Sequence, residues 1–355
     1  MLHNKADALV DRCIFVTCPM RSGSTLLSRM LNAHPAVAIS YDSVNFFRFC
    51  YHRYDPISDV ENAQRLVKDM AHRLYNRFEI KLDEHQCLAL LEEDRLSYGQ
   101  AFVSILRTIF SHTKKPILGD KEALAWTRIP DFLRMCPNGK VIVIVRDPRD
   151  VVTSFKYSTI APGNDYLIAL FNVVDAVNHG FRYRSEDPDR VYVMRFERLK
   201  TNTEDELQGL CKFLEVDFVS EMLDRDRYTD HMGNTWDAGE SLTFKEETDW
   251  LAPVGRWRRK IEREDLYLCE WIAGKQIAQL GLGLDGRVHS QEVFDNAIKR
   301  ITSSELLRNA FKRWCDVGEG MERFPLDPLD PANWDPGWVR HPEAFSKEAN
   351  PSGGN

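Results

Sequence analysis

Short apolar runs alternate with helical patterns along this chain, which restricts the folds that it can adopt. The clearest run is "KVIVIVRD" at residues 140–147. It is rich in β-branched residues, as is typical of a strand buried on both faces. Four shorter runs are also strand candidates, at residues 13–18, 36–40, 116–120 and 191–196. Helical patterns lie between or after them, at residues 24–33, across 59–111, and at 166–184, 203–214 and 263–280. Strands that alternate with helices predict an α/β fold in three layers, with a parallel sheet flanked by helices on both faces.

The chain changes character after about Gly286. Residues 293–315 have a helical pattern, whereas residues 325–355 hold six prolines and end in "PSGGN". Trp334 and Trp338 suggest that the first half of this tail packs on something, because bare linkers seldom carry tryptophan. We therefore expect a main domain at residues 1–285 and a C-terminal extension at 286–355, which is helical and then proline-rich.

Composition limits the class of protein. A net charge of −7 and a pI near 5.9 argue against a broad nucleic-acid surface. The eight cysteines show no CxxC spacing, which favours buried thiols in a reducing compartment over a disulfide framework or a zinc site. The N-terminus is polar, and no apolar run reaches the length of a membrane helix. We therefore expect a soluble cytoplasmic protein with no nucleic-acid or membrane partner.

The stretch "CPMRSGSTLL" at residues 18–27 joins the first predicted strand to the first predicted helix. Ligands of open α/β sheets bind at the carboxyl ends of strands, and free N–H groups at a helix start favour an anion. The turn places Ser22 at the start of the helix, and Gly23 lets the backbone approach a ligand closely. Ser24 and Thr25 can cap the helix or donate to oxyanions, and Arg21 adds a fixed charge. The stretch therefore predicts an anion-binding loop, with a plain capped turn as the alternative.

This loop lacks two features of nucleotide triphosphatases. Their pattern GxxxxGK[ST] needs a first glycine at the right spacing and a lysine before the serine. Neither is present here, since Gly23 stands directly before Ser24. A P-loop nucleotide kinase is therefore an alternative function that the sequence does not favour, and a binding protein that has lost its chemistry is another.

A second charged group follows the strongest strand. Arg146 lies at the carboxyl end of this strand, and Ser154 lies eight residues later, about two helical turns. If a helix starts near Pro148, Arg146 and Ser154 could contact one phosphate from two directions. We expect the intervening charged residues to form surface ion pairs and helix caps; they are Asp147, Arg149 and Asp150.

Together, "PMRSGSTLL" and "VIVIVRDPRDVVTSF" resemble the cofactor motifs of the sulfotransferases that use 3′-phosphoadenosine 5′-phosphosulfate (PAPS). The first resembles their 5′-phosphosulfate loop, and the second their 3′-phosphate motif, in which a serine follows an arginine by eight residues. The resemblance covers about residues 12–284 and is closest to the bacterial, tyrosylprotein and carbohydrate branches, which carry arginine in the loop. It implies a P-loop-like sheet, PAPS as the co-substrate, no metal, and a sulfotransferase domain at residues 1–285.

The resemblance also suggests catalytic residues. Arg21 would stabilise charge on the leaving phosphate, and Lys121, after a short strand, matches a catalytic lysine of the tyrosylprotein branch. The cytosolic branch has its catalytic histidine two residues after that lysine, where this chain has Ala123. The tyrosylprotein branch has a glutamate 21 residues beyond the loop arginine, and here that position is Asp42. Asp42 is thus the candidate base, unless it caps a helix that starts near Ser43. Lys121 could likewise be an exposed residue at a helix start. His52 and Glu122 are reserve candidates.

The stretch "VGRWRRKIE" at residues 254–262 resembles the C-terminal cofactor element of the family. Arg256 could reach a phosphate of the cofactor, and Trp257 could pack near the adenine or simply anchor the loop. Ser241 lies 15 residues before Arg256, a spacing at which the tyrosylprotein branch has a cofactor-binding serine.

In this fold, loops at residues 41–60, 157–166 and 228–253 and the C-terminal tail would shape the acceptor site. The aromatic stretch "SVNFFRFCYHRY" could line an acceptor pocket or belong to the core. We expect O-sulfation of a small molecule that carries a hydroxyl group, with a carbohydrate as the alternative acceptor. The oligomeric state stays open, with a homodimer as one option.

Overall fold

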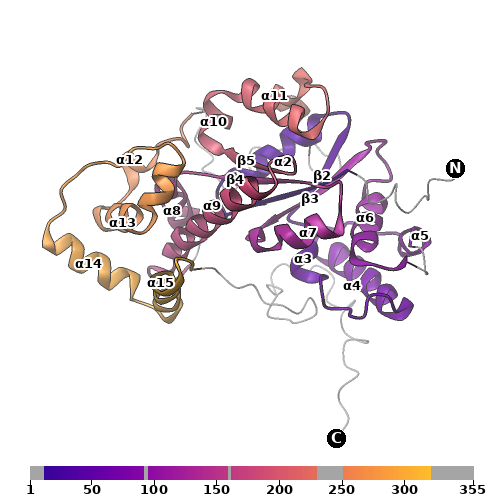
Figure 1. The fold of residues 1–355 in the computed structure, drawn as a ribbon, viewed down its shortest axis with the longest axis horizontal. Helices are drawn as coiled ribbons and strands as arrows, with labels where there is room; N and C mark the ends of the chain where they lie inside the picture. Colours follow the sequence, from indigo (N-terminus) through magenta and orange to yellow (C-terminus); the bar gives the residue numbers. More distant parts are fainter. Residues whose placement is uncertain (1–11, 92–94, 159–160, 230–250, 321–355) are drawn as a thin grey trace, which may run out of the picture. The chain divides into compact units, whose positions relative to one another are not determined.

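The chain folds around one five-stranded sheet. The computed structural model describes residues 12–91, 95–158, 161–229 and 251–320. The strands lie in the order β2-β3-β1-β4-β5, and the pairs β2/β3 and β4/β5 are parallel. Helices flank the sheet (Figure 1). The predicted α/β fold, with a parallel sheet between helices and a helical C-terminal region, is therefore confirmed.

The strands agree with the predicted runs to within two residues at each end, except at the end of β3. They are β1 (Cys13–Cys18), β2 (Val37–Tyr41), β3 (Ile117–Ala123), β4 (Lys140–Val145) and β5 (Val191–Arg195). The apolar β1 and β4 are buried along almost their whole length, as expected of strands covered on both faces. β3, by contrast, continues through Lys121 and Glu122, although the sequence predicted its end at Asp120. Lys121 is therefore a buried strand residue, and the alternative of an exposed residue at a helix start is wrong.

The described residues form two compact units. The first contains residues 12–15 and 34–140, and the second contains residues 16–33 and 141–320. The chain passes from one to the other within β1, after the first helix and at the start of β4. Each unit therefore combines segments that lie far apart in the sequence.

The first unit contains the described part of residues 59–111, which the sequence predicted as helical. Its helices are α3 (Phe46–Phe49), α4 (Val60–Phe78), α5 (Glu84–Ala89), α6 (Tyr98–Ile109), η2 (Trp126–Arg128) and α7 (Ile129–Met135). The starts of α4, α5 and α6 are capped by the side chains of Asp59, Asp83 and Ser97, each of which accepts a backbone N–H.

Aromatic side chains fill the core of the first unit. The ring of Phe15 contacts Phe47 and Phe132, and Phe46 contacts Phe102, with ring centroids 5.1–5.3 Å apart. Phe46 and Phe47 are at most 5% exposed. The aromatic stretch around them is therefore core, as one of the two sequence interpretations proposed.

The second unit holds the other helices that the structure describes. They are α2 (Ser24–Ala33), α8 (Pro148–Ser158), η3 (Asp165–Leu167), α9 (Ile168–Glu186), α10 (Phe196–Thr201), α11 (Thr203–Leu214), η4 (Ser220–Leu223), η5 (Arg225–Arg227), α12 (Trp257–Lys260), α13 (Arg263–Gln279), α14 (Gln291–Ile301) and α15 (Glu305–Val317). The predicted helix at 293–315 is thus two helices, and the side chain of Ser304 caps the second of them.

The C-terminal helices of this unit share a core with its central helices. α13 lies beside α8 and α9, α15 lies beside α9, and α14 lies beside α13 (Figure 1). Apolar side chains of these helices form one buried cluster. Val152 of α8 and Phe171 of α9 belong to it, together with Ile301 of α14 and Leu307 of α15. Residues 286–317 therefore pack as part of the second unit.

Some classes of site are absent from the part of the chain that the structure describes. It contains no cluster of three or more metal-binding side chains, and none of its helices is both long and apolar enough to cross a membrane. All eight cysteines are free thiols, and only Cys315 is exposed.

Candidate functional site

The turn after β1 presents backbone N–H groups at the start of α2. Arg21 and Gly23 adopt positive φ angles of 67° and 85°. The N–H of Leu27 makes the first helical bond, to the carbonyl oxygen of Gly23 at 3.1 Å. The N–H groups of the residues between them therefore have no acceptor within the helix. These groups and the helix dipole favour a negative ligand at this turn.

Gly23 and Ser22 give this turn its shape and its polarity. A Cβ on Gly23 would lie 2.2 Å from a ring carbon of Phe196, so the φ angle and the close packing both require glycine. Ser22 is fully buried, and its hydroxyl has no hydrogen-bond partner among the described residues. Because buried polar groups are normally paired, this hydroxyl is well suited to a ligand oxygen.

Arginines from distant segments converge on the turn. Arg146, the residue after β4, donates through one Nη to the carbonyl oxygen of Arg21 at 2.9 Å and through the other to the carbonyl oxygen of Pro253. Arg21 donates through Nε to the hydroxyl of Ser154 on α8 at 3.2 Å. Burial, with the positive charges of Arg146 and Arg256, lowers the pKa of Arg21 to about 10. The structure thus brings Arg21, Arg146, Ser154 and Arg256 together.

The charge at this turn is suited to an anion. Arg146 and Arg256 are only 4% and 2% exposed. Burial lowers the pKa of Arg146, and the positive charge of Arg256 lowers it further, although the nearby carboxylates of Asp150 and Glu197 oppose the shift. A negative ligand would relieve this repulsion. The residues present therefore fit a ligand with phosphate or sulfate groups.

Trp257 packs against two arginine side chains. Trp257 is buried, with the guanidinium groups of Arg149 and Arg258 over its ring at 4.0 and 4.7 Å. This environment favours the interpretation that Trp257 anchors its loop, over contact with an adenine. Ser241 lies outside the described residues.

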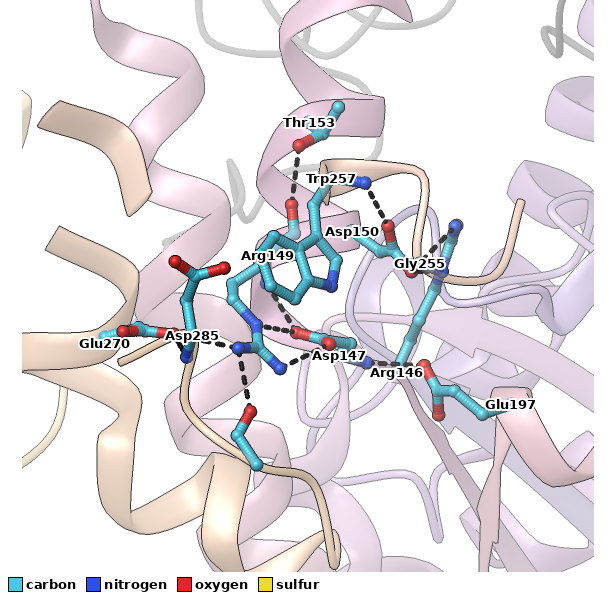
Figure 2. A network of polar contacts seen from close by, with 11 residues as sticks. Arg146, Asp147, Arg149, Asp150, Thr153, Glu197, Gly255, Trp257, Glu270 and Asp285 are labelled. Atoms are coloured by element: carbon cyan, nitrogen blue, oxygen red, sulfur yellow. Dashed lines mark hydrogen bonds and ion pairs between the residues drawn. The ribbon is translucent and has the colours of Figure 1, made fainter. Parts of the chain in front are cut away.

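The three charged residues after Arg146 are buried. The prediction placed their ion pairs at the surface, and that placement is wrong. Asp147, Arg149 and Asp150 are 4%, 1% and 1% exposed. Ion pairs and caps are present as predicted, because Asp147 accepts the N–H of Arg149 and pairs with its guanidinium, each at 2.9 Å (Figure 2). Segments more than 100 residues away cover them, which the local sequence could not reveal.

The first unit holds the other two catalytic candidates. β2 and β3 pair in a register that sets Tyr41 beside Lys121. The N–H of Asp42 then donates to the carbonyl oxygen of Lys121 at 3.3 Å, and its carboxylate meets the Lys121 ammonium at 2.5 Å. The Lys121 side chain is 3% exposed and that of Asp42 is 55% exposed. The structure thus pairs a buried cation with an accessible carboxylate.

The helix-cap alternative for Asp42 is wrong. The helix that follows, α3, starts after Asn45, and its first two N–H groups donate to Asp120 and Glu122 on β3, at 3.4 and 3.0 Å. Burial raises the pKa of Asp120 to about 7, and burial with the charge of Asp120 raises that of Glu122 to about 8. Glu122 therefore holds the start of α3, a role that the sequence did not suggest. His52 is largely exposed and pairs with Asp55 at 2.7 Å.

A comparison with known families decides the class of protein. A model described as "Sulfotransferase family" matches residues 13–220, which is more than half of the chain. The chain belongs to the sulfotransferase family. This match favours the sulfotransferase hypothesis over the kinase alternative, which also required a lysine that the loop lacks.

Individual sulfotransferases resemble the chain at low identity. A Caenorhabditis briggsae protein named "Putative protein-tyrosine sulfotransferase" is 23% identical over 223 residues, 60% of this chain and 69% of the relative. The sulfotransferase domain from the curacin biosynthetic pathway is 22% identical with a TM-score of 0.50, over 77% of this chain and 99% of that domain. The sulfotransferase domain of the Synechococcus PCC 7002 olefin synthase is 21% identical with a TM-score of 0.49, over 74% of this chain and 95% of that domain. The curacin domain supports the fold.

Proposed function

We propose that this sulfotransferase takes its sulfuryl group from PAPS and transfers it to a hydroxyl group of a small molecule. The observation that carries the proposal is the convergence of Arg21, Arg146 and Arg256 beside the start of α2. PAPS has two separate anionic groups, the 5′-phosphosulfate and the 3′-phosphate. A buried cluster of arginines beside free N–H groups suits such a ligand.

The donor site that we infer has two parts. The loop at residues 21–25 would hold the 5′-phosphosulfate through its N–H groups, the buried hydroxyl of Ser22 and the charge of Arg21. Arg146, Ser154 and Arg256 would hold the 3′-phosphate. Ser241 stays a predicted donor contact. Trp257 would act on the donor indirectly, by anchoring the segment that carries Arg256.

The transfer exchanges one bond to sulfur for another. The acceptor oxygen bonds to sulfur, the bond between sulfur and the bridging oxygen of the 5′-phosphate breaks, and the leaving phosphate keeps the electron pair. Arg21 and the N–H groups at the start of α2 would stabilise that growing charge. Asp42 would accept the proton of the acceptor hydroxyl. Lys121 would orient Asp42 through the ion pair and, as the resemblance implies, add positive charge for the leaving phosphate.

The acceptor class follows from the sequence and from the relatives. We infer a small-molecule hydroxyl, with a carbohydrate as the second class. The name of the Caenorhabditis briggsae relative adds the phenolic hydroxyl of tyrosine as a class to test. Seven buried free thiols support a reducing compartment, and hence the cytoplasm, as the place of reaction.

The donor proposal is tested by ligand binding and by transfer. The product 3′-phosphoadenosine 5′-phosphate (PAP) should raise the melting temperature, whereas ATP with magnesium should not. Radiolabelled sulfate should then pass from PAPS to at least one member of a panel of alcohols, phenols, sugars and tyrosine peptides. Stabilisation by ATP with magnesium but not by PAP would refute the donor proposal.

A further inference from the structure

One buried carboxylate holds the backbone on both sides of Arg256. Asp150 on α8 is 1% exposed. It accepts the N–H of Gly255 through Oδ2 at 2.7 Å and the N–H of Trp257 through Oδ1 at 2.9 Å (Figure 2). These two N–H groups flank Arg256 in the chain. The direction in which Arg256 leaves the backbone is therefore set by Asp150.

The neighbouring residue braces the same segment from another side. The guanidinium of Arg149 lies over the ring of Trp257 at 4.0 Å, and donates to Asp147, to Glu270 on α13 and to the carbonyl oxygen of Gly283, each at 2.9 Å (Figure 2). These contacts fix the guanidinium, which in turn fixes the indole. Arg146 adds a third contact, since it donates to the carbonyl oxygen of Pro253.

From these contacts we infer that Asp150, braced by Arg149, is a positioning residue that sets Arg256 for the 3′-phosphate of the donor. The inference rests on the proposed donor site. It assigns a function to the second acidic residue of the "RDPRD" stretch, whose carboxylate accepts two backbone N–H groups. It also makes the contribution of Arg256 to donor binding depend on Asp150.

A positioning role and a purely electrostatic role of Asp150 predict opposite effects of Asp150→Asn on the binding of an anion. Asp150 Oδ2 lies 3.8 Å from an Nη of Arg146. If Asp150 acted only through its charge, its neutralisation would strengthen the binding of an anion. If it positions Arg256, Asp150→Asn should weaken binding, because the amide has one oxygen for two N–H groups and turns its NH2 group toward one of them.

The test is a double-mutant cycle in which calorimetry measures the binding of PAP to each variant. We expect Arg256→Ala and Asp150→Asn each to raise the Kd for PAP by about tenfold or more. In the Asp150→Asn background, Arg256→Ala should raise the Kd for PAP by no more than about twofold. The reason is that a misdirected Arg256 already contributes little to PAP binding. Binding by Asp150→Asn that equals or exceeds that of the wild type, or effects that multiply in full, would overturn the inference.

Asp175→Asn is the matched control. Asp175 is also 1% exposed in the second unit, but accepts the N–H of Gly320 instead. In its background, Arg256→Ala should keep its full effect. If Asp150→Asn does not fold, as judged by circular dichroism, Arg149→Lys replaces it in the cycle with the same expectation.

Hydrogen exchange separates this inference from the donor proposal. Amides of residues 254–257 should exchange faster in Asp150→Asn than in the wild type or in Asp175→Asn, with no ligand present. Unchanged exchange there would contradict the positioning role. Failure of the wild type to bind PAP, with faster exchange in the variant, would refute the proposed donor and leave the structural role of Asp150 supported.

Discussion

Lys121 is nearly inaccessible, yet its ammonium group lies 2.5 Å from the exposed carboxylate of Asp42. A buried lysine cannot follow a mobile partner, so the ion pair fixes the direction in which the carboxylate points. Asp42 itself has a positive φ of 61°, which turns the chain away from β2 at this residue. The carboxylate is thus held at a strand end and open to an acceptor, as a general base requires.

Asp42→Asn should separate proton transfer from donor binding. The amide keeps the shape of the side chain but cannot accept a proton, so kcat for sulfate transfer should fall by about 10²–10⁴-fold. The Kd for PAP should stay within about twofold of the wild type, since Asp42 lies outside the proposed donor contacts. Glu61→Gln, at an exposed acid of the same unit, serves as the control and should keep full activity. A kcat for Asp42→Asn close to that of the control would exclude Asp42 as the base.

At Gly23 the backbone conformation and the packing against Phe196 both require glycine. Gly23→Ala should destabilise the protein by about 1–3 kcal/mol, because its φ is positive and the new methyl group would meet Phe196. Urea denaturation measures the loss. Gly274→Ala in α13 is the matched control, because nothing lies within 4 Å of the added carbon. It should be neutral or stabilise by up to about 1 kcal/mol. Equal effects of both variants would show that the turn is not tightly packed.

At the scale of elements, the alternation of β3 explains how one short strand serves two purposes. Successive side chains of a strand point to opposite faces. Lys121 can therefore meet Asp42, while Asp120 and Glu122 together accept the first N–H groups of α3. Charged residues are unusual in a buried strand, which is why the sequence predicted the strand to end too early. The carboxylates are accommodated because the start of α3 supplies donors.

The acidic face of β3 should make stability depend on pH. Burial, with the charge of Asp120, raises the pKa of Glu122 from 4.5 to about 8, so the native protein keeps a proton that the unfolded chain loses in this window. The contribution of protonated Glu122 to the free energy of unfolding is complete below about pH 4.5 and is lost as the pH rises through about 8. Glu122→Gln should flatten the fall in the free energy of unfolding between about pH 5 and pH 8.5. The amide keeps an oxygen for the N–H of Phe47.

Denaturation in urea at several pH values measures this slope. Glu186→Gln is the control, since the Glu186 side chain is 59% exposed, and its slope should equal that of the wild type. The same slope for Glu122→Gln as for this control would show that Glu122 is ionised in the native protein at neutral pH.

Elements were more predictable than the contacts that join them. β1, α2 and α11 have the predicted bounds, because apolar periodicity and local helix signals determine them. The anion loop and Arg146 could be proposed from the sequence because the residues of each proposal lie within a single short stretch, and their roles stay predictions. Arg149 and Asp150 were wrongly predicted to lie on the surface, because their burial depends on residues 253–285. Local sequence patterns do not identify partners so far away in the chain.

At the scale of the whole molecule, the two units are each assembled from separate stretches of chain. The second unit begins with residues 16–33 and continues from residue 141 to the helices of the C-terminal region. Its candidate donor residues accordingly come from α2, the end of β4, α8 and the segment before α12. Such a site forms only when the whole unit folds, so its integrity should depend on residues that never approach the ligand.

Two adjacent leucines of α15 test whether the C-terminal helices belong to the cooperative core of this unit. Leu307 is fully buried in the cluster that includes Val152 of α8, whereas Leu306 is 44% exposed. Leu307→Ala should therefore lower the free energy of unfolding by about 2–5 kcal/mol, and Leu306→Ala should change it by no more than about 0.5 kcal/mol. Urea titrations followed by circular dichroism and by tryptophan fluorescence should show the shift in the main transition with both probes. If Leu307→Ala affected only a minor, separate transition, α14 and α15 would form an appendage, and the donor site would not require them.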